Sequence, residues 1–277
     1  MKTAFISEKA KSRFNLNFIL SPITALVLMA VAETVGYFAF MPLFFIFIDN
    51  AFVTLSLELL AFAFISLAII LWARFVEKSP WLGLGIRKKG ALKDFLLGWG
   101  IGAAMLTTCV LLMWGFGAIQ VTSFQFSANL VGEFLILVLA WSIQGTTEEL
   151  LTRGWMFSSL AAKHNIPVGI LVSSLFFTFL HLSNDGISLI PLLDLTLFAI
   201  LACLVMLKTG NLWVIGGLLE LFPRKCLCLS SERNTGWPGL YRSRNLWSRL
   251  VVRWCIWCGR LSYQPPYPSW YDHLVGI

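Results

Sequence analysis

Long apolar runs separated by short polar stretches dominate the pattern of hydrophobic and polar positions along the chain. About 20 apolar residues cross the hydrocarbon core of a bilayer as one helix, so runs of this length predict transmembrane helices. The pattern predicts an all-α fold, a polytopic integral membrane bundle of about seven spans with an irregular C-terminal tail. The expected spans cover residues 18–41, 51–75, 94–117, 128–149, 166–182, 188–207 and a segment that begins near 211. Residues 153–164 form either a short connecting helix or the end of the fourth span.

Composition supports a membrane protein and changes the meaning of the net charge. The chain is 58% hydrophobic and 13% charged, with a mean hydropathy of +0.79, which is typical of a multi-spanning membrane protein rather than a soluble one. A net charge of +7 would suggest nucleic-acid binding in a soluble protein. Here the lysines and arginines gather near span ends, where they set topology and attract anionic headgroups. Membrane lipids are therefore expected partners, and nucleic acid is not.

The basic clusters also predict the orientation of the chain in the membrane. Clusters at 2–13 and 74–93 bracket the first two spans, and Lys163 and Lys208 close later ones on the same side. The positive-inside rule then places the N-terminus in the cytoplasm of a cell membrane. The first basic and apolar segment resembles a signal peptide, but its apolar run is too long, so a first transmembrane helix is expected.

The composition of the sequence changes near residue 220, and together with the basic loop before residue 94 this change divides the chain into three regions. These are an N-terminal two-span region at 1–93, a core at 94–219 and a basic tail at 220–277. The tail holds eight of the 21 lysines and arginines and four of the six cysteines. A genuine basic tail and a shifted reading frame near Leu218 both explain this composition, and the odd residue usage favours the frameshift. The same composition makes chance a better explanation than zinc binding for the tail's C-x-C and C-x-x-C pairs.

Two adjacent carboxylates and an arginine interrupt the apolar pattern at the end of the fourth run. Charges near the middle of a bilayer cost roughly 2.5–3.5 kcal/mol each and usually mark a functional site. Glu149 and Arg153 are four residues apart, so they share a helix face in the favourable order. Glu148 points about 100° away and need not be neutralised by Arg153. The segment therefore predicts one paired acid and one acid that does chemistry.

A histidine closes the fifth apolar run. His181 follows Phe177 by one helical turn in the stretch F-F-T-F-L-H-L-S-N. A lone histidine at a span end is more often interfacial than catalytic, but beside a buried glutamate it can share an activated water or ligate a metal. The expected span limits raise a difficulty, since Glu148 and His181 would finish on opposite membrane faces. They meet only if both helices continue for roughly two turns.

The two motifs together resemble the CAAX protease and bacteriocin-processing (CPBP) family of intramembrane proteases, which includes the type II CAAX prenyl endopeptidases. The resemblance rests on E-E-x-x-x-R at 148–153, F-x-x-x-H at 177–181 with Asn184 beyond, and K-T-G-N-L-W at 208–213, and it covers roughly 95–219. It implies an all-helical membrane fold with a cavity open to the cytoplasm, and hydrolysis of a hydrophobic or lipidated peptide. By the same resemblance Glu148 and His181 polarise the attacking water, Glu149 and Arg153 support the helix and the site electrostatics, and Asn184 is a secondary polar contact.

The chain departs from this family at its third motif. The family places a histidine and, four residues later, an asparagine on the next span, but residues 215–223 read I-G-G-L-L-E-L-F-P. Loss of an oxyanion donor typically lowers the rate by about 10²–10³, so a weakly active or inactive chain is expected. The sequence does not decide whether the protein uses a divalent metal such as zinc. A catalytic zinc normally has three protein ligands, and one carboxylate with one histidine supplies only two.

Two other functions compete with the peptidase. A non-catalytic membrane binder or immunity protein on the same scaffold would explain the missing third motif. A transporter with Glu148 and His181 as a proton relay is also conceivable, but no inverted repeat in the sequence supports it. Independently of function, Gly98, Gly102 and the pair 216–217 predict close helix packing.

Overall fold

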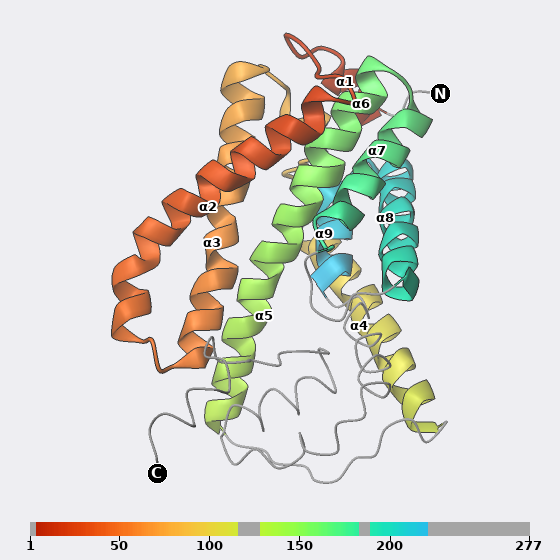
Figure 1. The fold of residues 1–277 in the computed structure, drawn as a ribbon. Coiled ribbons are helices and arrows are strands. Elements are labelled where there is room, and N and C mark those ends of the chain that lie inside the picture. Colours follow the sequence, from red (N-terminus) through yellow and green to blue (C-terminus); the bar gives the residue numbers. More distant parts are fainter. Residues whose placement is uncertain (1–3, 116–127, 183–188, 221–277) are drawn as a thin grey trace. The chain divides into compact units, whose positions relative to one another are not determined.

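The structure is a computed structural model that describes residues 4–115, 128–182 and 189–220. Within these ranges the secondary structure is helical and contains no strand, so the predicted all-α membrane bundle is confirmed (Figure 1). Among the described residues, four helices are long and apolar enough to cross a membrane, Leu20–Ile46, Ala51–Val76, Val131–Lys163 and Leu189–Thr209, and Ile166–Phe179 is a shorter apolar helix. The predicted tail at 220–277, its cysteines and Pro223 lie outside the described residues, as does Asn184.

The elements follow the apolar runs closely. They are α1 Ala4–Lys9, α2 Leu20–Ile46, α3 Ala51–Leu71, the π-helix η1 Trp72–Val76, the 3₁₀-helix η2 Trp81–Leu84, α4 Ala91–Gly115, α5 Ala128–Glu149, the π-helix η3 Leu150–Phe157, α6 Ser158–Lys163, α7 Ile166–Phe179, α8 Leu189–Thr209 and α9 Leu212–Glu220.

Of the two alternatives for residues 153–164, the end of the fourth span is confirmed, and the span is longer than 128–149. The helix that begins as α5 continues without a break through η3 and α6, so that one span covers Val131–Lys163. The charges at 148–153 do not end it, because the residues that follow them are apolar and buried in the protein. Glu148 therefore lies near the middle of a long helix and not at its end.

The long helix and α7 form one antiparallel hairpin (Figure 1). The chain turns at His164, and the Asn165 side chain caps α7 by accepting a hydrogen bond from Val168 N at 2.9 Å. Gly169 lets α7 approach closely, since a Cβ there would lie 2.9 Å from the ring of Phe157 and 3.0 Å from its carbonyl oxygen. Nearly the same number of residues separates Glu148 and His181 from the turn. In an antiparallel hairpin this equal spacing allows the two side chains to lie at a similar level, whereas the expected span limits placed them on opposite membrane faces.

Helix α9 packs against α4 through glycines, as the sequence predicts. A Cβ on Gly98 would lie 2.0 Å from the carbonyl oxygen of Val214, and one on Gly217 would lie 2.2 Å from that of Phe95. Such contacts require that the two helix backbones touch at the crossing. Gly216 faces α5, where a Cβ would lie 3.0 Å from Thr146 Oγ1. Helix α9 is consequently held between α4 and the long helix that carries Glu148.

The segment K-T-G-N-L-W is tied to the loop before α4. Gly210 has a φ of +57°, a left-handed conformation that glycine adopts without strain. Asn211 then caps α9 by accepting from Trp213 N at 3.1 Å, and its side chain donates to Asp94 Oδ2 at 2.6 Å. The Trp213 indole donates to the carbonyl oxygen of Arg87 at 2.7 Å. These bonds fix the start of α9 against the basic loop.

One end of the bundle gathers the segments that carry the basic clusters. Helix α1 packs against η2 and α6, and the rings of Phe18 and His164 lie 5.6 Å apart. Leu212 N donates to the carbonyl oxygen of Gly85 at 2.9 Å. The N-terminal segment, the loop after α3, the α6–α7 turn and the α8–α9 turn therefore share one end of this part of the chain.

The glycine contact between α4 and α9 makes a sharp prediction. Gly98→Ala places a methyl group against the backbone of α9, which cannot move aside as a side chain would, so we expect a loss of at least about 1–3 kcal/mol in stability. Gly100→Ala on the same helix is the matched control, because no atom lies within 4 Å of the added Cβ. Thermal unfolding in detergent should show a lower midpoint for Gly98→Ala alone. Equal midpoints for the two variants would contradict this packing.

Candidate functional site

The predicted ion pair forms inside the protein. Arg153 Nη1 donates to Glu149 Oε1 at 2.9 Å, and neither side chain is exposed to solvent. Arg153 Nη1 also donates to Thr152 Oγ1 at 2.7 Å, and this hydroxyl donates to the carbonyl oxygen of Glu148 at 2.6 Å. A charge-assisted network of this kind locks the arginine in one conformation. The prediction that Glu149 and Arg153 pair on one helix face is confirmed.

The pair spans the start of a π-helical segment that sequence reasoning missed. All eight residues of η3, Leu150–Phe157, are buried. A π-helical segment inside an α-helix changes the direction of the side chains that follow it, and such segments are frequent at functional sites. No pattern in the sequence signals it, because the apolar periodicity near residue 150 is broken by the charged residues themselves.

Two ring contacts connect the ion pair to His181. The guanidinium carbon of Arg153 lies 4.4 Å from the centre of the Phe177 ring, a cation–π contact that partly compensates a buried arginine. The rings of Phe177 and His181 lie 4.7 Å apart. Both residues come from α7 and the turn after it, whereas Arg153 comes from η3. The structure therefore brings the E-E-x-x-x-R and F-x-x-x-H motifs together across the hairpin.

A backbone hydrogen bond fixes the tautomer of His181. Its Nδ1 lies 2.8 Å from the carbonyl oxygen of Phe177. A carbonyl oxygen only accepts, so Nδ1 carries the hydrogen and donates it. In the neutral imidazole, Nε2 then holds a lone pair and is the nitrogen that can accept a proton or ligate a metal. His181 is partly exposed, which allows a substrate or water to approach it.

Glu148 has a different environment from its neighbour. Its side chain is partly exposed, whereas Glu149 is fully buried. Gln144, one turn earlier, donates from Nε2 to Glu148 Oε1 at 3.1 Å, which orients the carboxylate. Sequence reasoning missed Gln144, although a polar side chain four residues before Glu148 in an apolar run was the available signal. The two adjacent carboxylates thus differ in burial and partners, as predicted.

The described residues do not form a zinc site. Within the described ranges, no three side chains of histidine, cysteine, aspartate or glutamate gather where they could hold a metal ion. A catalytic zinc normally has three protein ligands. Helix α9, where the third family motif would lie, carries L-W-V-I-G-G-L-L-E and no histidine or asparagine.

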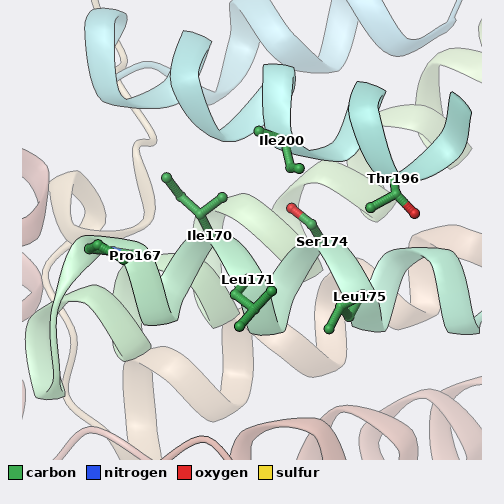
Figure 2. A pocket seen from close by; sticks show the side chains of 7 residues that line it. All are labelled: Pro167, Ile170, Leu171, Ser174, Leu175, Thr196 and Ile200. Atoms are coloured by element: carbon green, nitrogen blue, oxygen red, sulfur yellow. The ribbon is translucent and has the colours of Figure 1, made fainter. Parts of the chain in front are cut away.

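An apolar groove lies between α7 and α8, apart from the ion pair. It has a volume of about 290 Å³, and Figure 2 shows Thr196 and Ile200 of α8 facing Ile170 and Ser174 of α7. Its outer wall includes Leu171 and Leu175. Phe177 contacts Arg153 from a helix face roughly opposite to that of Leu175, about 200° away. Ile170 and Ser174 of the groove, however, lie seven residues before Phe177 and His181, so they share a face of α7 with these motif residues.

Comparison with known proteins supports the predicted resemblance over one part of the chain. Residues 130–218 match the family model described as type II CAAX prenyl endopeptidase Rce1-like. The matched segment runs from α5 into α9 and includes both motifs, whereas α1 to α4 precede it. No curated protein and no solved structure matches the chain.

The buried pair predicts a characteristic pattern of stabilities. Glu149→Leu leaves the Arg153 guanidinium buried without its carboxylate, so we expect a loss of about 3–5 kcal/mol. The double variant Glu149→Leu/Arg153→Met removes both charges and should recover most of that loss, because apolar residues often replace a buried pair at little cost. Thermal unfolding of the single and double variants measures the coupling. A double variant no more stable than Glu149→Leu would show that the two side chains do not depend on each other.

Proposed function

We propose that this multi-pass membrane protein is an intramembrane peptidase in which Glu148 and His181 activate a water molecule. The observation that carries the proposal is the contact of Arg153 with Phe177 and of Phe177 with His181. This contact sets the histidine against the helix that carries Glu148. The match of residues 130–218 to an endopeptidase family model supports the same reaction class.

The proposed reaction follows from the chemistry of the two side chains. The Glu148 carboxylate accepts a proton from water while the water oxygen forms a bond to the scissile carbonyl carbon. His181 accepts a hydrogen bond from the same water at Nε2. The tetrahedral intermediate then collapses, the C–N bond breaks, and the proton held by Glu148 passes to the leaving amine. No acyl-enzyme forms, and Glu149 and Arg153 keep the helix and its electrostatics fixed.

Slow turnover is expected for this chain. The described part of α9 provides neither the histidine nor the asparagine that the resemblance implies. Without those donors, the negative charge that develops on the scissile carbonyl oxygen lacks part of its stabilisation, and each missing donor typically lowers kcat by about 10²–10³. Asn184 is proposed as a secondary polar contact.

The proposed substrate is a hydrophobic or lipidated peptide held at the membrane. The helices that form the site are apolar on their outer surface, with Leu171, Leu175 and Phe179 of α7 exposed. Such a surface is suited to contact with lipid, and a substrate that partitions into the membrane or is anchored to it would be held beside these helices.

Cleavage of a reporter peptide tests the proposal. Purified chain in liposomes should cleave a membrane-anchored fluorogenic peptide slowly, and Glu148→Ala or His181→Ala should lower the rate by about 10²–10⁴, the usual contribution of a general base. Glu133→Gln is the matched control, because Glu133 is a partly exposed carboxylate on the same helix. It should leave the rate unchanged. Equal rates for Glu148→Ala and the parent chain would overturn the proposal.

The second candidate is a non-catalytic peptide-binding or immunity protein. The absence of histidine and asparagine from the described part of α9 favours it. Under this alternative, the parent chain and Glu148→Gln bind the reporter peptide with the same affinity and neither cleaves it. The cleavage assay above, with binding measured in parallel, separates the two candidates.

We also propose that the N-terminus faces the cytoplasm of a cell membrane. The basic segments gather at one end of the bundle, whereas Asp49 lies in the α2–α3 turn at the other end of these helices. An impermeant maleimide added to intact cells should label Asp49→Cys and leave Lys11→Cys at the background of the parent chain. Labelling of Lys11→Cys alone would reverse the orientation.

A further inference from the structure

A second buried charge cluster lies outside the candidate site. Lys9 Nζ and Glu77 Oε2 are 2.6 Å apart, and neither side chain is exposed. The other carboxylate oxygen, Glu77 Oε1, accepts hydrogen bonds from the indole N–H groups of Trp72 and Trp155, each at 3.0 Å. Lys9 Nζ also donates to Ser79 Oγ at 3.3 Å. We call these five residues the Glu77 cluster.

The cluster joins three segments that are far apart in the sequence. Lys9 ends α1, Glu77 follows η1, and Trp155 lies in η3. The rings of Phe5 and Phe157 lie 6.1 Å apart, so α1 contacts η3 at a second point. Gly83 allows η2 to cover this contact, because a Cβ there would lie 3.0 Å from the backbone of Lys9. Helix α1 is thus seated in the protein, not on its surface.

The Glu77 cluster orients side chains more than it adds net stability. A buried ion pair contributes little net stability, since removal of both ions from water offsets their attraction. Burial lowers the pKa of the Lys9 amino group, and the neighbouring Glu77 carboxylate opposes that shift. The ion pair does fix the orientation of the Glu77 carboxylate. A carboxylate held by Lys9 presents one oxygen to two indole donors, and hydrogen bonds to a charged acceptor are strong and aligned.

Trp155 connects the oriented Glu77 carboxylate to the helix segment that carries Arg153. It lies two residues after Arg153 in the same π-helical segment and is fully buried. The rotation of η3 about its axis decides whether Arg153 points at Phe177. A hydrogen bond from Trp155 to a fixed carboxylate sets that rotation.

We propose that Glu77 is a positioning residue for the peptidase site. Lys9 holds the Glu77 carboxylate, the carboxylate holds Trp155, and Trp155 fixes η3 so that Arg153 faces Phe177 of α7. The expected effect on turnover rests on the proposed function. In this inference α1 supports the peptidase site, because Lys9 at its end holds the Glu77 carboxylate.

Three variants and a control test the inference. Glu77→Gln removes the charge that holds Lys9, and Trp155→Phe removes the indole donor. Lys9→Met/Glu77→Gln removes both charges but keeps an amide oxygen that accepts from Trp155. Lys11→Met is the matched control, since Lys11 is an exposed lysine just after α1, and its partner Glu8 is also partly exposed.

Kinetics on the folded fraction give the first measurement. Glu77→Gln and Trp155→Phe should lower kcat by about 10–10²-fold with little change in KM, because a displacement of about 1 Å at the site costs that much. Lys9→Met/Glu77→Gln should recover most of the kcat that Glu77→Gln loses. Unchanged kcat in folded Trp155→Phe, or no recovery in the double variant, would overturn the positioning role.

Hydrogen exchange gives a second measurement that does not depend on activity. Glu77→Gln and Trp155→Phe should speed amide exchange within residues 150–157, whereas the double variant and Lys11→Met should match the parent chain. If exchange responds in this way and the parent chain cleaves nothing, the positioning of η3 stands and the peptidase proposal fails. Unchanged exchange in Glu77→Gln and Trp155→Phe would overturn the inference itself.

Discussion

A carboxylate and a guanidinium persist among apolar helices only if each neutralises the other, and Glu149 and Arg153 meet this condition on consecutive turns of one helix. Their bond of 2.9 Å is fully shielded from solvent. Arg153 is held there with its guanidinium carbon over the Phe177 ring, and this contact joins the long helix to α7. The pair also leaves Glu148 in a separate, partly exposed environment. Through Arg153 and Phe177, this interaction brings the two motifs together.

The frame around the pair also uses small residues and capped turns. Gly98 and Gly217 let α9 lie against α4, and Gly169 lets α7 lie against Phe157. Asn211 begins α9 and binds Asp94 at the same time. Close backbone contact is the main source of helix association where lipid gives no hydrophobic drive. Such a frame is rigid, and a site that depends on the rotation of one π-helical segment requires that rigidity.

Local signals in the sequence predicted much of this arrangement. The apolar runs predicted the helices, the four-residue spacing predicted the bond between Glu149 and Arg153, and the same spacing predicted that Phe177 and His181 share a face. The sequence left open whether residues 153–164 end the fourth span, because it does not show that charges which pair along a helix need not terminate it. The π-helix and the Glu77 cluster were not predicted, since Lys9, Glu77 and Trp155 meet only through tertiary contacts. The roles of Glu148, His181 and Asn184 stay predictions.

The central claim is that Glu148 and His181 share one water molecule, and a short crosslink tests it most directly. Cysteines at 148 and 181 should be joined within one chain by a bifunctional thiosulfonate that spans about 5 Å, the separation of two groups that bind the same water. Mass spectrometry of the linked peptides separates this product from those of the native cysteines. The account predicts a 148–181 link and no link between cysteines placed at 133 and 181. A link at 133–181, or none at 148–181 although each cysteine reacts alone, would contradict it.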